Sequence, residues 1–313
     1  MNTKTALLFA GQGAQAVGMG KDFAAQFPSA QTWFDRANAT LGYDLTKICF
    51  EGPEAELTKT EHAQPGIYLV GWIAFQLLKE QLPSLNFEAT AGLSLGEFTA
   101  LAAAGSLTFE EGLQVVRDRG RFMQEDCQNT QGGMAAIIGL DEPLTREVCA
   151  EAGVELANLN CPGQIVISGA AKELAHACEL AKARGAKKAL PLPVAGAYHS
   201  RLMASAQEKL RTVLAAVPIK SPAVPVISNV TAGPHGAPEE IGRKLVQQVT
   251  SSVRWEDSMR YLLAQGFNRF IELGPGTALT GFMKRIDKNA QIVNVADGGS
   301  LKASVEACRG REA

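Results

Sequence analysis

One serine in this chain stands in the sequence context of a catalytic nucleophile. Ser94 is the centre of Gly92-Leu93-Ser94-Leu95-Gly96, a G-x-S-x-G motif. The motif lies between an apolar segment, residues 87–93, and an alanine-rich segment that runs to residue 104. A strand, a sharp turn and a helix in this order would expose the serine hydroxyl at the helix N-terminus, where backbone amides favour negative charge. The context predicts a nucleophile elbow, whereas elsewhere the same residues would form an ordinary small-residue turn.

A serine hydroxyl needs a base at neutral pH, and the chain holds four histidines. His176 falls in a charged helical pattern and His62 and His235 fall in polar loops, so we expect all three at the surface. His199 instead follows a predicted strand, precedes a predicted helix and lies downstream of the serine. An α/β-hydrolase-like Ser–His pair would have its base at such a position.

Residues 11–15, Gly-Gln-Gly-Ala-Gln, follow the first apolar segment and resemble a degenerate dinucleotide-binding loop. We reject that interpretation, because residues 31–38 have a helical pattern and no strand ending in Asp or Glu follows at the required distance. A loop at the carboxyl end of a strand can instead supply one backbone amide of an oxyanion hole, and the residue after the serine supplies the other.

Three arginines, Arg117, Arg119 and Arg121, lie in one predicted helix. A solvated helix face would explain them, but side chains two residues apart point about 200° apart, so Arg119 and Arg121 cannot share one environment. One of them can face inward. A buried arginine needs an anionic partner, which a substrate carboxylate would supply through a charge-assisted contact.

Composition excludes several classes of protein. The 313 residues are 46% hydrophobic and 20% charged, enough for a large core and incompatible with disorder. The 30 Lys and Arg balance 32 Asp and Glu, so we do not expect nucleic acid as a partner. Six cysteines without a C-x-x-C pair indicate reduced thiols in a cytoplasmic protein, and with four histidines they argue against a metal site. The longest apolar run, residues 66–78, is too short to cross a membrane.

The order of elements predicts a fold that would position these residues. Strands at 6–10 and 87–93 flank a buried helix over 66–82, which Pro65 opens. Thr108 and Glu111 form a capping box for the next helix, which ends near residue 127. Residues 128–197 then have the order βαββαβ of a ferredoxin-like unit. Further elements are expected at 202–217, 224–228, 239–248, 255–265 and 270–273, followed by Gly274-Pro275-Gly276 and a last helix.

Five segments together resemble the malonyl-CoA:acyl-carrier-protein transacylase family over nearly the whole chain. They are residues 11–15, residues 92–97, Arg117-Asp118-Arg119-Gly120-Arg121-Phe122-Met123-Gln124, Tyr198-His199-Ser200 and Glu272-Leu273-Gly274-Pro275-Gly276. The resemblance implies an α/β protein in which residues 1–127 and 198–313 form an α/β-hydrolase-like catalytic subdomain and residues 128–197 form an inserted ferredoxin-like subdomain. One departure is that Leu93 stands where the family usually has histidine.

The resemblance also implies roles for individual residues. Ser94 corresponds to the nucleophile and His199 to its base, oriented by the backbone carbonyl of Gln248 rather than by an acid such as Asp257 or Glu272. The backbone amides of Gln12 and Leu95 would form the oxyanion hole. Arg119 would bind the malonyl carboxylate, and Gln64 would line the pocket. We also expect Tyr198 and Leu95 to narrow the pocket, as in malonyl-preferring members.

The implied activity is transfer of a malonyl group from malonyl-CoA to the phosphopantetheine thiol of acyl carrier protein through a malonyl-serine intermediate, supplying fatty acid or polyketide chain extension. No metal or resident cofactor is implied, since the CoA thioester and the carrier's phosphopantetheine are substrates. We expect a cytoplasmic monomer. The alternatives are a serine hydrolase on the same scaffold and an inactive module that binds carrier protein.

Overall fold

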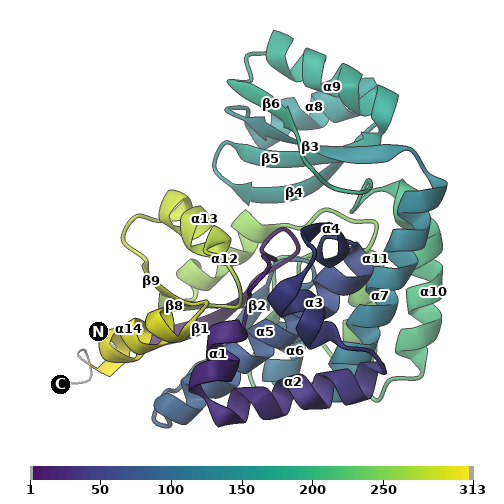
Figure 1. The fold of residues 1–313 in the computed structure, drawn as a ribbon. Coiled ribbons are helices and arrows are strands. Elements are labelled where there is room, and N and C mark those ends of the chain that lie inside the picture. The colour runs from purple at the N-terminus through teal and green to yellow at the C-terminus, as the bar shows by residue number, and fades with distance from the viewer. Residues whose placement is uncertain (1–2, 310–313) are drawn as a thin grey trace.

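The larger of two sheets is built from strands that are distant in sequence. The computed structural model describes residues 3–309, and its five-stranded parallel sheet has the order β7-β2-β1-β8-β9 (Figure 1). Parallel neighbours need crossover connections, and helices supply most of them. The strands are β1 (Lys4–Phe9), β2 (Ala89–Gly92), β7 (Val226–Ile227), β8 (Phe267–Leu273) and β9 (Gln291–Val295).

The smaller sheet belongs to the inserted segment, whose predicted order βαββαβ is confirmed. Its elements are β3 (Gly132–Ile138), α8 (Glu142–Ala152), β4 (Glu155–Cys161), β5 (Gln164–Ala170), α9 (Ala171–Ala183) and β6 (Lys188–Pro191). The antiparallel order β4-β5-β3-β6 is that of a ferredoxin-like sheet, and a separate apolar core lies between it and the two helices, which cover one face (Figure 1). The predicted boundary after residue 127 falls inside a helix that continues to Asn129.

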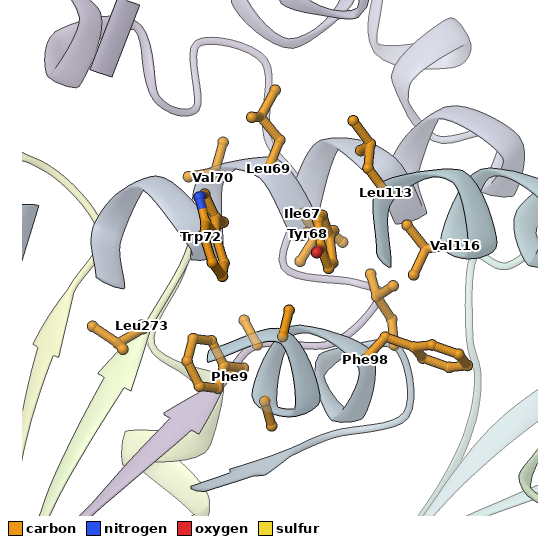
Figure 2. Close-up of a cluster of buried hydrophobic side chains, with 14 of the residues drawn as sticks. Phe9, Ile67, Tyr68, Leu69, Val70, Trp72, Phe98, Leu113, Val116 and Leu273 are labelled. Atoms are coloured by element: carbon orange, nitrogen blue, oxygen red, sulfur yellow. The ribbon is translucent and has the colours of Figure 1, made fainter. Parts of the chain in front are cut away.

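The core of the large subdomain is centred on two long helices. Helix α5 (Thr60–Gln81) is buried along most of its length and packs against α7 (Phe109–Asn129) (Figure 2). Tyr68 is fully buried between them and donates a hydrogen bond to the carbonyl of Phe109 at 3.1 Å. The expected buried helix is therefore present. Pro65 does not open it, however, but lies inside it, five residues after Thr60, where it removes one backbone donor from the helix.

Other helices surround these layers. The capping box at the start of α7 is present, since Thr108 accepts from the Glu111 amide and Glu111 accepts from the Thr108 amide. The expectation that one last helix follows residue 276 was wrong, because β9 and α14 come after α13. The apolar residues of β9 are too few to reveal an edge strand in the sequence. The other helices are α1 (Lys21–Gln26), α2 (Pro28–Leu41), α3 (Leu45–Glu51), α4 (Glu54–Leu57), α6 (Gly96–Ala103), η1 (Arg201–Met203), α10 (Ala204–Ala215), α11 (Pro238–Gln248), α12 (Trp255–Ala264), α13 (Ala278–Ile286) and α14 (Gly298–Arg309).

Two general expectations concern the chain as a whole. All six cysteines, which we expected to be mostly buried, are buried. Over residues 3–309, none of the helices combines the length and the apolar character that a bilayer crossing requires.

The turn between β2 and α6 is closed by glycines. A Cβ atom on Gly92 would lie 1.9 Å from the backbone carbonyl carbon of Gly96, and a Cβ on Gly96 would lie 2.2 Å from the carbonyl oxygen of Phe9. Both contacts are with backbone, which cannot move aside as a flexible side chain can. The glycines therefore let α6 begin directly above the ends of β1 and β2.

We predict that Gly92→Ala lowers the free energy of unfolding by more than about 3 kcal/mol, because the added methyl overlaps backbone in the core. Gly281→Ala, in α13, is the matched control, since Gly281, like Gly92, has no positive φ but nothing lies within 4 Å of the added carbon. That change should alter the free energy of unfolding by less than about 1 kcal/mol. Urea unfolding followed by circular dichroism measures both, and equal losses would contradict steric closure of the turn.

Candidate active site

Ser94 sits at the tip of this turn in a strained backbone conformation. Its φ of 51° is in the left-handed region, which a non-glycine residue occupies only when its surroundings enforce it. The Ser94 amide donates to Oδ1 of Asn229 at 2.6 Å, and Asn229 Nδ2 donates to the carbonyl of Gly92 at 2.8 Å. These two bonds fix the turn from the side opposite the glycines.

His199 lies beside the serine hydroxyl. Its Nε2 is 2.7 Å from Ser94 Oγ, and its Nδ1 is 2.9 Å from the backbone carbonyl of Gln248, the last residue of α11. A carbonyl only accepts, so Nδ1 carries the proton and Nε2 is left to accept from the serine. Burial and, to a smaller extent, the nearby Arg119 charge lower the pKa of His199 to about 4, although the bond to the Gln248 carbonyl acts in the opposite direction. The imidazole is therefore neutral near pH 7 and can act as a base.

The acidic residues closest by chain order lie elsewhere. Asp257 pairs with Arg254 at 2.9 Å, and buried Glu272 accepts from the amides of Leu279 and Thr280 at the start of α13. Among residues 3–309, no carboxylate hydrogen-bonds to His199.

The other histidines differ in their surroundings. His176 is exposed as expected, while His62 is half-buried against the Glu56 carbonyl. The expectation that His235 is exposed was wrong. Its side chain is fully buried, 2.6 Å from Glu97 Oε1, because the loop after β7 folds back beneath α6.

Arg119 is the inward-facing arginine of α7 and is only 1% exposed, whereas Arg121 is exposed and pairs with Glu125. The Nη1 atom of Arg119 donates to Gln64 Oε1 at 2.6 Å. Its Nη2 donates to Ser94 Oγ at 3.1 Å and to Gln248 Oε1 at 2.9 Å. Burial lowers the pKa of Arg119 to about 10, while the negative charge of Glu97 acts in the opposite direction. At pH 7 the guanidinium is a buried cation next to the serine.

Gln64 and Gln12 belong to one chain of hydrogen bonds that leads away from Arg119. Gln64 Nε2 donates to Thr60 Oγ1 at 2.9 Å, and Thr60 Oγ1 donates to Gln12 Oε1 at 2.8 Å. This chain joins the start of α5 to the loop after β1. It fixes the side chain of Gln12 and leaves its backbone amide near the serine.

The two amides expected to form the oxyanion hole belong to Leu95, which follows Ser94 directly, and to Gln12, which lines the same cavity as Ser94. Gly11 packs so tightly against the elbow that a Cβ there would be 2.3 Å from the Leu93 carbonyl oxygen, which brings the adjacent Gln12 to the serine. Leu95 begins the turn into α6. Within the part of the chain that the structure describes, neither amide is bonded to another residue, so both remain available to a ligand.

A cavity of about 550 Å³ opens onto Ser94 and His199 between the two subdomains. The loop after β1, the elbow and Tyr198 line one side, and Met134, Asn158 and Asn160 of the small subdomain line the other. The expectation that Leu95 narrows this pocket was wrong, since its side chain is fully buried in the core below the turn. Leu93 lines the cavity instead.

Three groups at this site had not been expected from the sequence: the side chains of Glu97, Asn229 and Gln248. Gln248 Nε2 donates to Glu97 Oε2 at 2.6 Å and to the Ser94 carbonyl at 2.9 Å. Glu97 comes directly after the G-x-S-x-G motif, which was a usable signal. Asn229 lies 135 residues beyond the serine with no motif of its own.

Known proteins match this chain over nearly its full length. The acyl transferase domain family matches residues 6–304. A malonyl CoA-acyl carrier protein transacylase of Bacillus subtilis is 45% identical over 309 residues, 97% of each chain. A solved structure of this transacylase from Coxiella burnetii superposes with a TM-score of 0.94 at 36% identity, covering 98% of both chains. A malonyl-transacylase in complex with a type II polyketide synthase acyl-carrier protein also has a TM-score of 0.94, at 36% identity, covering 97% of this chain and 100% of that one.

These matches include the large sheet, the inserted subdomain and the elbow between β2 and α6. Identity and coverage at this level, on a fold that superposes along its whole length, mean that the chain belongs to the acyl transferase domain family, among the malonyl-CoA:acyl-carrier-protein transacylases.

Proposed function

We propose that this protein transfers a malonyl group from malonyl-CoA to the phosphopantetheine thiol of an acyl carrier protein, with Ser94 as the acyl carrier in between. The observation that carries the proposal is the placement of three groups: Ser94 Oγ lies 2.7 Å from a neutral His199 and 3.1 Å from the buried guanidinium of Arg119. A nucleophile, a base and a fixed cation together suit an acyl group that itself bears a carboxylate.

In the first step, His199 Nε2 takes the proton of Ser94 Oγ while the oxygen attacks the thioester carbonyl. The amides of Gln12 and Leu95 would stabilise the tetrahedral oxyanion. Collapse breaks the C–S bond, the imidazolium returns its proton to the CoA sulfur, and malonyl-Ser94 remains. The carrier protein's thiol then attacks the ester with His199 again as base, and Ser94 recovers its proton. The two half-reactions form a ping-pong mechanism that needs no metal or resident cofactor.

Arg119 would bind the free carboxylate of the malonyl group. A buried guanidinium forms strong charge-assisted bonds with a carboxylate, and acetyl-CoA offers no anion to compensate it. Tyr198, buried directly before the base, would restrict space at the α-carbon. Because a pocket discriminates one methyl group by only about 1–3 kcal/mol, methylmalonyl-CoA should react slowly rather than not at all.

The second substrate would dock over the cavity between the subdomains. The complex of a related transacylase with a polyketide carrier protein supports an acyl carrier protein as partner. We propose that the protein acts as a cytoplasmic monomer and supplies malonyl groups to fatty acid or polyketide chain extension.

The main alternative is a serine hydrolase, in which water resolves the acyl-enzyme. Two observations speak against it: the base is held by a backbone carbonyl rather than by a triad acid, and a buried cation lies beside the serine hydroxyl. An inactive carrier-binding module would have no use for the strained serine and its base.

We expect malonyl-CoA to add one malonyl group to the wild-type protein and none to Ser94→Ala, as measured by intact-mass spectrometry. On addition of holo carrier protein the mass of the malonyl group should move to the carrier. Release as free malonate would instead indicate a hydrolase, and absence of any adduct on the wild type would indicate an inactive module. An adduct that persists on Ser94→Ala would exclude this serine as nucleophile.

The lowered pKa of His199 predicts an unusual pH dependence of acylation. The neutral imidazole is the active form, and with a pKa of about 4 it persists as pH falls, until the pH approaches that value. The single-turnover acylation rate should therefore change less than about threefold between pH 7.5 and 5.5. A histidine with an ordinary pKa near 6.5 would lose about tenfold over this range. Circular dichroism at each pH verifies that the protein stays folded.

We predict that Arg119→Ala lowers the malonyl acylation rate about 100-fold and the acetyl rate less than about tenfold, because only malonyl loses a charge-assisted contact. Arg121→Ala, on the exposed side of the same helix, is the control and should leave both rates unchanged. Stopped-flow acylation with the two CoA esters measures the preference. A parallel fall of both rates after Arg119→Ala would mean that the carboxylate site lies elsewhere.

A further inference from the structure

The Arg119 guanidinium is held by neutral acceptors only. Its contacts are the Gln64 side-chain oxygen, the Ser94 hydroxyl and the Gln248 side-chain oxygen, and among the described residues no carboxylate lies within ion-pair distance of it. Its Nε is buried without a partner. The cation thus keeps donor capacity for a ligand, but its orientation depends on which atoms the neighbouring amides present to it.

Gln248 can present either of two atoms to Arg119. A carboxamide has one accepting oxygen and one donating NH2 group, and a flipped amide would point N–H groups at a cation that can only donate. In the structure the oxygen faces Arg119, while Nε2 donates to Glu97 Oε2 at 2.6 Å and to the Ser94 carbonyl at 2.9 Å. Both of these partners can only accept, so Glu97, which makes the shorter bond, and the Ser94 carbonyl together determine which way this amide is turned.

Hydrogen bonds to both carboxylate oxygens fix the Glu97 side chain. It lies in the first turn of α6, fully buried, with Oε1 at 2.6 Å from His235 Nε2. Oε2 also accepts from the backbone amide of Asn229 at 3.2 Å. The loop after β7 thus holds Glu97, Glu97 holds the Gln248 amide, and the amide holds Arg119.

We propose that Glu97 is a positioning residue for acyl-group selection: through the Gln248 side chain it orients Arg119 to receive the substrate carboxylate. The inference rests on the proposed malonyl transfer and names a residue that contacts neither substrate nor the reacting atoms. Because one amide separates Glu97 from Arg119, the buried carboxylate orients the cation without occupying the place of the substrate's own carboxylate.

The test compares acylation by malonyl-CoA and acetyl-CoA in Glu97→Met, Glu97→Gln and Gln248→Met. Glu97→Met removes both carboxylate oxygens of Glu97 and should lower the malonyl-to-acetyl rate ratio at least tenfold. Glu97→Gln should stay within threefold of the wild-type ratio, because its oxygen can still accept from Gln248, while its NH2 donates to His235 Nε2 once the ring proton moves to Nδ1. Gln248→Met removes the bridging amide but keeps the backbone carbonyl that holds His199, and should also lower the ratio at least tenfold.

Glu272→Met is the matched control, since Glu272 is another buried carboxylate whose hydrogen bonds, at the start of α13, lie outside this network. It should lower the unfolding midpoint while the ratio stays within twofold of wild type. In an Arg119→Ala background, Glu97→Met should change the ratio less than twofold, because the side chain through which it acts is absent.

Equal loss of both acyl rates in Glu97→Met and Gln248→Met would overturn the proposal and make Glu97 a support of the elbow alone. An unchanged ratio in Gln248→Met would overturn it even if Glu97→Met failed to fold. A ratio that still falls in the Arg119→Ala background would also overturn it. Failure of the wild-type protein to accept malonyl at all would instead refute the proposed function.

Discussion

The tight turn between β2 and α6 is the constraint on which the site depends. Gly92 and Gly96 allow the start of α6 to approach the backbone of β1 and β2, and the chain between them has no room for an ordinary conformation. Ser94 therefore adopts a φ of 51°, and Asn229 and Gln248 bind its amide and carbonyl to hold it there. The strain is located where an exposed hydroxyl is needed, and the surrounding core supplies the energy to maintain it.

Burial of charge is the second organising factor. Arg119, Glu97 and His235 lie within one water-excluded region, and an uncompensated charge there would cost several kcal/mol. Polar bonds through Gln248 and Gln64 connect the cation to its surroundings without saturating it. Burial is the main cause of the lowered pKa of His199, and the same cation lowers it further, so the group that would recognise the substrate also favours the neutral base.

The cavity adds the small subdomain to this arrangement. All the groups next to the serine come from the large subdomain, while Met134, Asn158 and Asn160 close the cavity from the opposite side. The small subdomain has its own apolar core and sheet, and backbone hydrogen bonds between β4 and Val253 attach it to the large subdomain. This division suits an enzyme that must admit two large substrates in turn at one serine.

Local patterns in the sequence were sufficient for most of the elements, the βαββαβ insert and the candidates Ser94 and His199, whereas the family resemblance selected Arg119 among three arginines. An elbow, a capping box and helical spacing each depend on residues within a few positions of one another, so they can be recognised in a linear string. The family resemblance added Gln248, whose carbonyl is indeed beside His199. The edge strand β9 escaped notice because its pattern is short and only partly buried.

Contacts between distant segments were decided by the tertiary structure alone. The burial of His235, the inward side chain of Gln248 and the place of Leu95 beneath the turn all depend on how loops after β2 and β7 pack together, more than 130 residues apart. No local propensity encodes such a pairing. The sequence thus determined which residues could do the chemistry, whereas packing determined which polar groups surround them. A buried hydrogen bond forms only where the fold brings both partners together and excludes water from both, and no single segment specifies that.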